Sequence, residues 1–587
     1  MNSTWIVLTV GVALLASRRL RPDFVVVGTV LALQLSGALS LQQALAGFSN
    51  PAVVTVAAFM MLSNAARGVD WHRLWEAWLQ RRGNSIGSLS FWTMWAGGLL
   101  AGIIHEEQAV GMLMPGTIRA GRQQGIPPSK LVLPLAYGAL LGRTLFLVGS
   151  PAALLVIWAM NTAEIKPFGL FDFTFISMLF LMLGSLFMAL VGHTVLPWRR
   201  AESDPLDRFR VRRRLMEFVV RPDSPVIGKS LGDIRWGQSM DVIVLGLKRT
   251  HEPILAPAAQ LQLAHGDVLI AQVEPSCIAP LSRDAGLEPV PNVTLGTEDI
   301  THGDIELVEV VVRLDSPLQR QSLRQVDFRR RYNLSVLAIA RGSRVLVDAL
   351  GDIPLQAGDV LLLQGDRRRV DLMLPEAKAI PLGERAVPRR TRERSSWTVG
   401  GVVVALGLAG SGLLPLLSAF LLAALLMAAL TRYSTRDAYR VLDWPLLVLL
   451  AGVVPWAEAM RSSHLSERLV EALLGGWASP NPYAVLFVVY LIVVALVTVM
   501  NAPVVAVLLP PVVLGIATQL GVNPQPFLMT LVLASSAVFL WPVGHRTHIL
   551  VQSTGGYVAG DYAKLGIWLV LLMGLLNVLI VPQLWPF

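Results

Sequence analysis

Apolar runs that equal or approach the length of a membrane span occupy most of this chain, and they restrict its fold more than any other feature. A helix needs about 17–25 mostly apolar residues to cross a bilayer. The runs cover residues 5–17, 24–39, 52–66, 89–104, 131–158, 173–197, 399–414, 419–430, 444–460, 484–499, 527–551 and 567–581. The pattern predicts a mainly α-helical, polytopic membrane protein with two membrane halves.

The composition agrees with a membrane location and excludes other classes. Hydrophobic residues make up 54% of the 587 residues and charged residues 15%, whereas soluble domains carry about 25% charged residues. Cys277 is the only cysteine, which excludes a disulfide scaffold. The sequence has no phosphate-loop motif, Cys/His metal spacing or nucleophile elbow, so we do not expect an enzyme. The formal charge of +9 fits basic cytoplasmic loops, and no nucleic-acid partner is expected.

The central residues, 200–394, differ from both membrane halves. Charges are dense there and no long apolar run survives. Short Val, Ile and Leu segments alternate with Gly-Asp and Asp-Ser-Pro turns, which is typical of a soluble β-containing domain. We expect an α+β insert in the cytoplasm.

The insert repeats itself. The segment EFVVRPDSPVIGKSL (217–231) recurs 92 residues later as EVVVRLDSPLQRQSL (309–323). At the same offset, GDVLIAQ (266–272) recurs as GDVLLLQ (358–364). A constant offset across separate motifs indicates two copies of one small domain. The copies are expected at residues 205–285 and 297–378.

The membrane part also repeats. GMLMPGTIRAG, from Gly111, aligns with AVLLPPVVLGI, from Ala506, and GSPAALLV, from Gly149, aligns with GHRTHILV, from Gly544. Two apolar helices, 109–118 and 504–520, closely follow spans and are expected to be too short to cross comfortably, so each is interpreted as the returning arm of a re-entrant hairpin. The repeats are expected at 1–200 and 395–587, with hairpins at about 86–121 and 483–520.

The number of crossings predicts how the repeats are oriented. Each half has five full spans and one hairpin on this interpretation. Five is odd, so the second repeat must be inverted relative to the first, with the amino end outside and residues 200–394 in the cytoplasm. The basic residues expected inside are Arg18, Arg19, Arg21, Arg81, Arg82, Arg119, Arg122, Lys130, Arg432, Arg436 and Arg440. Inverted repeats with broken helices indicate a secondary transporter.

Four motifs carry a resemblance to a known family. They are SNPAVVTVAAFMML (49–62), the segment from MLMPGTIRAG to FLVGSP (112–151), NAPVVAVLLPPV (501–512) and PVGHRTHILVQSTGGY (542–557). The membrane part resembles the divalent anion/sodium symporter family, within the broader ion transporter superfamily. The insert resembles a tandem pair of TrkA-C domains.

The resemblance implies a bacterial inner-membrane carrier. It implies an elevator-type mechanism, a homodimer, and a small anion substrate of the sulfate, dicarboxylate or citrate class. Coupling to sodium is the family's usual arrangement. The TrkA-C-like pair implies either regulation by a small molecule or a lid that stabilises the dimer. The insert has no Gly-rich fingerprint after a strand, so neither NAD nor ATP is expected as a cofactor.

The first hairpin tip departs from the family's Ser-Asn-Thr-like motif. It reads His105-Glu106-Glu107-Gln108, whereas the second tip keeps Asn501. A buried carboxylate can carry a proton at neutral pH. Coupling to protons through Glu106 and Glu107 therefore stands beside coupling to sodium, and no resident metal is expected beyond a transported Na⁺.

The helix breaks predict an anion site. Broken helices expose backbone groups at mid-membrane, and their amino ends carry partial positive charge that attracts anions. Arg143 precedes the break near Gly149, and Arg546 follows the break near Gly544. A guanidinium can bind a carboxylate or sulfate with two hydrogen bonds. The alternative for Arg143 is an ion pair with Glu106 or Glu107.

The complete set of expected substrate- and ion-binding residues includes polar groups that have structural alternatives. Hydroxyl and amide groups at breaks can cap helices instead of binding ions, and lone histidines are often structural. The set is Glu106, Glu107, Gln108, Arg143, Thr144, Gly149, Ser150, Asn501, Gly544, His545, Arg546, Thr547 and His548.

Three functions remain open on the sequence. The first is a secondary active anion transporter coupled to Na⁺ or H⁺. The second is a cation or cation/proton exchanger, because the acids of the first tip could bind cations directly. The third is a non-transporting membrane sensor whose insert binds a ligand.

Overall fold

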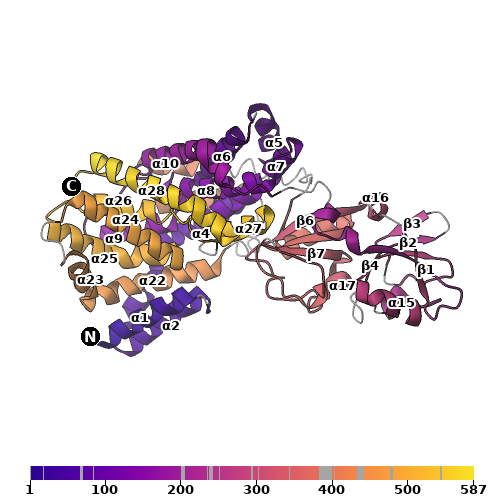
Figure 1. The fold of residues 1–587 in the computed structure, drawn as a ribbon. Coiled ribbons are helices and arrows are strands. Elements are labelled where there is room, and N and C mark those ends of the chain that lie inside the picture. Colours follow the sequence, from indigo (N-terminus) through magenta and orange to yellow (C-terminus); the bar gives the residue numbers. More distant parts are fainter. Residues whose placement is uncertain are drawn as a thin grey trace.

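A computed structural model shows a helical body with two small β-sheet lobes beyond one end of it (Figure 1). The structure describes residues 2–587 except 18, 66–70, 84, 200–204, 235, 237–241, 250–251, 259, 292–294, 296, 302, 343, 383–399, 402–403, 432–441, 476–479 and 543–544. The body contains residues from both ends of the chain, and the lobes are the central insert.

Most helices of the first half overlap the predicted apolar runs. They are α1 (Asn2–Ser17), α2 (Pro22–Leu35), α3 (Leu41–Leu45), α4 (Pro51–Ala65), α5 (Trp71–Arg82), α6 (Ile86–Ile103), α7 (Glu106–Gln123), α8 (Val132–Gly142), α9 (Pro151–Thr162) and α10 (Thr174–Phe187). Those of the second half are α20 (Leu416–Thr431), α22 (Trp444–Ser462), α23 (Leu465–Leu474), α24 (Pro482–Val499), α25 (Ala502–Leu520), α26 (Gln525–Ala534), α27 (Arg546–Gly555) and α28 (Ala559–Leu584).

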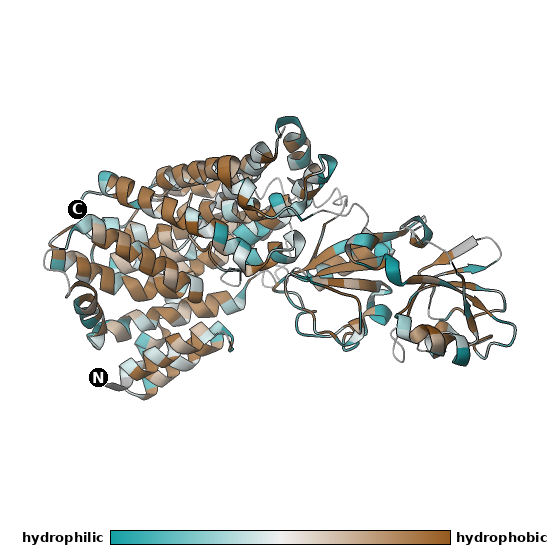
Figure 2. Ribbon diagram, viewed as in Figure 1, coloured by the Kyte–Doolittle hydropathy of each residue, from teal (hydrophilic) through white to brown (hydrophobic). Residues whose placement is uncertain are grey.

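The surface of the helical body is apolar, as a lipid-facing surface must be. Figure 2 shows hydrophobic residues along the lengths of the helices and polar residues gathered toward their ends and toward the insert. Large side chains such as Leu31, Leu425 and Leu575 are more than half exposed. Within the described residues, seven helical segments are long and apolar enough to cross a membrane: Leu41–Ser63, Ile86–Ile103, Thr174–Val195, Trp444–Ser462, Pro482–Val499, Ala502–Leu520 and Ala559–Leu584. The protein is therefore a multi-pass membrane protein.

Two helical hairpins occupy the predicted positions, and their tips have matching backbones. In the first, α6 ends at Ile103 and α7 starts at Glu106, with Ile104 (φ −128°, ψ 166°) and His105 (φ −60°, ψ 139°) between them. In the second, α24 ends at Val499 and α25 starts at Ala502, with Met500 (φ −111°, ψ 172°) and Asn501 (φ −76°, ψ 139°) between them. Each hairpin is therefore broken by two extended residues at equivalent positions.

One expectation about these hairpins is wrong. The returning arm α25 has 19 residues and is long and apolar enough to cross a membrane. It is longer than expected because it begins at Ala502, directly after the break. Pro503 stands in its first turn, where a missing N–H costs nothing.

Two further helices are interrupted near the predicted breaks. In the first repeat α8 ends at Gly142 and α9 starts at Pro151, with Ser150 as the cap. In the second, α26 ends at Ala534 and α27 starts at Arg546, with His545 as the cap. Each repeat therefore has one hairpin and one broken helix.

The insert contains two five-stranded antiparallel sheets. The first holds β1 (Leu215–Val220), β2 (Ile243–Arg249), β3 (Glu252–Leu255), β4 (Val268–Gln272) and β5 (Leu287–Pro289) in the order β3-β2-β4-β1-β5. The second holds β6 (Ile305–Val312), β7 (Ser335–Arg341), β8 (Arg344–Leu346), β9 (Val360–Asp366) and β10 (Ala379–Pro381) in the order β8-β7-β9-β6-β10. The orders are the same, copy for copy, and the last strand of each sheet lies just after the expected end of its copy.

The copies contact each other through equivalent residues. The Gln272 side chain donates to the Leu337 carbonyl at 2.9 Å, and Gln364 donates to the Leu245 carbonyl at 3.2 Å. Each donor and each acceptor is 92 residues from its counterpart. The two copies are therefore paired like the halves of a symmetric dimer.

The second copy lies against the helical body. Arg122 of α7 forms an ion pair with Glu309 of β6 at 3.4 Å, and the Gly342 N–H donates to Ser553 of α27 at 2.9 Å. Both chain termini lie at the opposite end of the body (Figure 1). The insert and the two termini therefore lie at opposite ends of the helical body.

Candidate anion site

Four helix amino ends meet at one cavity of about 350 Å³, which is lined by the helical body and by Leu314 and Arg320 of the insert. They belong to the hairpin arms α7 and α25 and to the half-helices α9 and α27. His105, Ser150, Asn501 and His545, which stand at the cap positions of these helices, all line it. The first N–H groups of a helix lack partners within the helix, and the helix dipole adds positive potential there. Four such ends around one cavity favour a bound anion.

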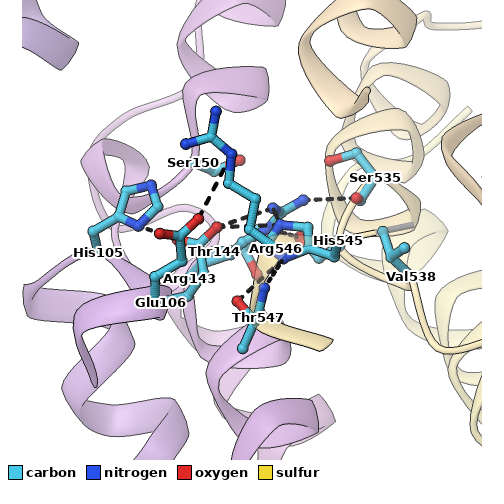
Figure 3. A network of polar contacts seen from close by, with 12 residues as sticks. His105, Glu106, Arg143, Thr144, Ser150, Ser535, Val538, His545, Arg546 and Thr547 are labelled. Carbon is cyan, nitrogen blue, oxygen red and sulfur yellow. Dashed lines mark hydrogen bonds and ion pairs between the residues drawn. The ribbon is translucent and has the colours of Figure 1, made fainter. Parts of the chain in front are cut away.

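Glu106, the first residue of α7, lies at the centre of a polar network (Figure 3). Its carboxylate is 3% exposed. One oxygen, Oε1, lies 3.5 Å from Arg143 Nη1 and 3.3 Å from His545 Nε2. The other, Oε2, has no hydrogen-bond partner in the structure and lies 3.5 Å from His105 Nδ1. The acid is thus buried beside cationic groups, with one oxygen left unsatisfied.

Arg143 is held by both repeats. It follows α8 of the first repeat, and it donates from Nη2 to the Ser535 carbonyl at 2.7 Å and from Nε to Ser536 Oγ at 3.2 Å. Both acceptors lie in the break of the second repeat. The guanidinium is 4% exposed, so it is fixed between the two breaks and faces Glu106. The ion pair considered on the sequence is therefore present, at a long distance.

His545 caps α27 and also reaches the acid. Its Nδ1 accepts from the Thr547 N–H at 3.3 Å. Its Nε2 lies 3.3 Å from Glu106 Oε1 and 3.1 Å from Arg143 Nη1. The His545 side chain therefore both caps α27 and takes part in the polar network around Glu106.

Arg546 neutralises two acids at the edge of the cavity. It forms an ion pair with Asp443, the cap of α22, and its Nε lies 3.8 Å from Glu107 Oε1. The first hairpin tip is therefore tied to the second repeat through both of its acids, Glu106 by His545 and Glu107 by Arg546.

The second tip presents neutral groups to the same cavity. Asn501, Ala502 and Pro503 line it, and the Asn501 side chain makes no capping bond to its own helix. Ser150 differs, because its Oγ accepts from the Ala153 N–H at 3.4 Å. The alternative of a helix cap thus holds for Ser150, and the amide of Asn501 remains available to a ligand.

Several expected site residues lie away from the cavity. The Thr144 hydroxyl donates to the Leu141 carbonyl at 3.0 Å, and His548 is fully buried with its Nε2 2.5 Å from the Val538 carbonyl. Gln108 accepts from Ser63 at 2.7 Å. These contacts support structural roles.

Two further expected site residues, Gly149 and Thr547, do not line the cavity. A Cβ on Gly149 would lie 2.4 Å from the Arg143 carbonyl, so only glycine fits there. Thr547 is buried in the first turn of α27. Gly544 lies outside the described residues.

The structure adds residues that the sequence did not single out. Arg21, Asp23 and Arg320 line the cavity, and Ser535, Ser536 and Asp443 hold its arginines. Arg320 comes from the insert. No motif marks these positions, although Asp443 directly precedes an apolar run beginning with Trp-Pro, a signal typical of a helix cap.

The acids of the site are not arranged as a metal site. Among the described residues, no group of three or more His, Cys, Asp or Glu side chains could hold a metal ion. Glu106 and Glu107 instead face arginine and histidine. The chemistry that the site supports is the binding of an anion beside a buried acid.

Comparisons with known proteins point in the same direction. A model of the citrate transporter family matches residues 12–510. Escherichia coli (strain K12) has a similar protein, "Uncharacterized transporter YfbS", 26% identical over 99% of this chain and 98% of its own length. The Synechocystis "Uncharacterized transporter sll0640" is 26% identical over 94% of this chain and 91% of its own length. "Sodium/sulfate cotransporter 1" of Chlamydomonas reinhardtii is 24% identical over 55% of this chain and 38% of its own length.

Proposed function

The chain belongs to the citrate transporter family, and we propose that it is a secondary active transporter of a small anion of the sulfate, dicarboxylate or citrate class. The observation that carries the proposal is the convergence of four helix amino ends on one cavity that also holds Arg143 and Arg546. Family membership makes it a transporter and not an enzyme. The anion class rests on the cavity and on relatives named as sodium/sulfate cotransporters.

The anion would bind between the helix ends and the two guanidinium groups. The backbone N–H groups of α7, α9, α25 and α27 would donate to its oxygens. Arg143 is well placed to take part because its contact with Glu106 is long, 3.5 Å. A dianion or trianion would compensate the cationic groups better than a monoanion.

We propose that Glu106 couples transport to protons. While it is ionised, its charge holds Arg143 and opposes an incoming anion. Protonation removes that charge and frees the guanidinium for the substrate. Proton and anion would then bind together, which is the requirement for symport. The unsatisfied Oε2 offers the place for the proton.

Sodium coupling is the competing arrangement. It is suggested by the names of the relatives, and it would need neutral oxygen ligands at the tips. Asn501 and the carbonyl groups at the breaks are the groups available for it. Direct cation exchange has less support, because each acid of the first tip faces a cationic side chain.

Further parts of the proposal follow from the resemblance. The hairpins and broken helices would move together as the transport domain of an elevator carrier, in a homodimer in the bacterial inner membrane. The insert, residues 200–394, would lie in the cytoplasm as a pair of TrkA-C-like domains.

The deciding experiment is uptake into proteoliposomes. Sulfate, succinate and citrate would be tested with a sodium gradient or a proton gradient imposed separately. Each condition would be repeated with Glu106→Gln, and with Glu107→Gln as the matched control. Proton-driven uptake that is lost with Glu106→Gln supports the proposal. Sodium-driven uptake that survives it would reject proton coupling through Glu106, and no uptake of any of the three anions would count against the anion class.

A further inference from the structure

The two copies of the insert share the backbone of one turn and carry different residues at its left-handed position. In the first copy Gly228 adopts φ +78° and its N–H donates to the Leu263 carbonyl at 2.8 Å. In the second copy the equivalent residue is Arg320, with φ +64°, and its N–H donates to the Leu355 carbonyl at 2.7 Å. The backbone is the same, and only the side chain differs.

Arginine is an unfavourable residue for this turn. A positive φ brings Cβ close to the backbone, so glycine is preferred there. Non-glycine residues in this conformation concentrate at functional sites, where another requirement compensates for the strain. The first copy shows that the turn itself does not need the arginine.

The requirement for an arginine at this turn comes from the adjoining anion cavity. Arg320 and Leu314, from the same turn region, line the cavity on which the four helix amino ends converge. The second copy is brought there by close contact. A Cβ on Gly358 would lie 2.3 Å from the Ile549 carbonyl of α27. On the first copy, a Cβ on Gly266, the equivalent residue, or on Gly228 would meet nothing within 4 Å.

The charge of Arg320 is available. The other arginines of the cavity face acids: Arg21 pairs with Asp23, Arg143 with Glu106, and Arg546 with Asp443. Within the described part of the chain, no acidic side chain pairs with Arg320, which is exposed. It is therefore the cavity's cation that an incoming anion can engage without displacing a carboxylate.

We propose that Arg320 is a substrate-binding residue, contributed by the insert at its side of the anion cavity. This inference rests on the proposed function, because it assumes that the cavity takes an anion. It makes the second copy of the insert part of the transport site, whereas the first copy supports it from a distance. The ligand is the same sulfate- or carboxylate-bearing anion that the helix ends receive.

The test replaces Arg320 by the residue of the first copy. Arg320→Gly keeps the turn and removes strain, so the melting temperature in detergent should not fall. Uptake of sulfate and citrate would be measured in proteoliposomes whose insert faces the outer buffer. We expect KM to rise about tenfold with the maximal rate nearly unchanged, since one charge-assisted contact is lost. Arg320→Lys should restore part of the affinity.

Gly228→Arg is the matched control. It places the same strained arginine in the copy that does not reach the cavity, so KM should stay at the wild-type value. An unchanged KM for Arg320→Gly, in a wild-type protein that transports either anion, overturns the inference and leaves the proposed function standing. Absence of transport by the wild type would instead refute the proposed function. Equal effects of the two variants would assign the change to the insert's stability and also reject the inference.

Discussion

The two hairpin tips have nearly the same backbone and very different side chains. His105 and Asn501 share a ψ of 139° and start α7 and α25 from equivalent extended residues. The first tip continues with two acids, and the second with alanine and proline. The shared backbone supplies helix amino ends, which attract an anion from either tip. On the proposed function, proton coupling would belong to the first tip, where a carboxylate is buried.

The difference also shows how the repeats depend on each other. Both acids of the first tip contact second-repeat residues, Glu106 with His545 and Glu107 with Arg546. In return, Arg143 of the first repeat is held by Ser535 and Ser536 of the second. A charge introduced in one repeat has thus been balanced in the other, so the asymmetry belongs to the assembled site.

The largest effect is expected from Glu106→Gln. The amide keeps the shape of the side chain and removes the titratable group, so proton-driven uptake should fall by about 100-fold or more, as expected for the loss of an essential proton carrier. Uptake at pH 5.5, 6.5 and 7.5 would measure it, with Glu107→Gln as the control. A wild-type pH profile in Glu106→Gln would show that the tips do not differ in coupling.

Arg143→Gln tests whether the buried ion pair stabilises the assembly of the two repeats. Removal of one partner leaves Glu106 buried beside fewer cationic groups, at a cost of about 3 kcal/mol in stability. Thermal unfolding in detergent should show a lower melting temperature. The double variant Glu106→Gln/Arg143→Gln should recover much of this loss, because no unpaired charge remains. Additive losses in the double variant would mean that the two side chains do not interact.

Asn501→Ala tests the neutral tip. Loss of one amide contact to the anion should raise KM by about tenfold and leave the pH dependence unchanged, since the amide does not titrate. Uptake kinetics at two pH values would distinguish this from a coupling defect. A shifted pH profile would contradict the division of roles between the tips. Asn481→Ala, at the start of α24 and away from the cavity, is the matched control.

The smallest effect is expected from Ser150→Ala. Its hydroxyl caps α9 through Ala153, and loss of a cap costs about 1 kcal/mol. The melting temperature should fall slightly and KM should change little. A large rise in KM with an unchanged melting temperature would show instead that the hydroxyl binds the anion.

The repeats were predictable from the sequence because their motifs recur at a constant offset along the chain. Pro115 and Pro510 stand at the same offset as the other aligned membrane motifs, which predicted equivalent hairpins. The constant offset of 92 residues likewise predicted the two copies of the insert. The length of α25 was not predicted, because the apolar run was judged to begin after Pro503, whereas proline is compatible with a first helical turn. At the 395-residue offset of the aligned membrane motifs, Glu106 would stand opposite Asn501. In the structure it is His105 that holds the equivalent cap position.

The candidate site also has features that the sequence predicts and features that only the tertiary structure decides. The sequence alone determined that helices break near Gly149 and His545, that Arg143 and Arg546 lie near these breaks, and that Glu106 lies at the first hairpin tip, because such signals are local. The pairing of the charged side chains was decided only by the tertiary structure. Arg143 and Ser536, or Arg320 and the cavity, are far apart in the chain and carry no mutual signature. Their contacts arise from the packing of one repeat on the other and of the insert on α27, where a buried charge must find whatever partner the fold brings near it.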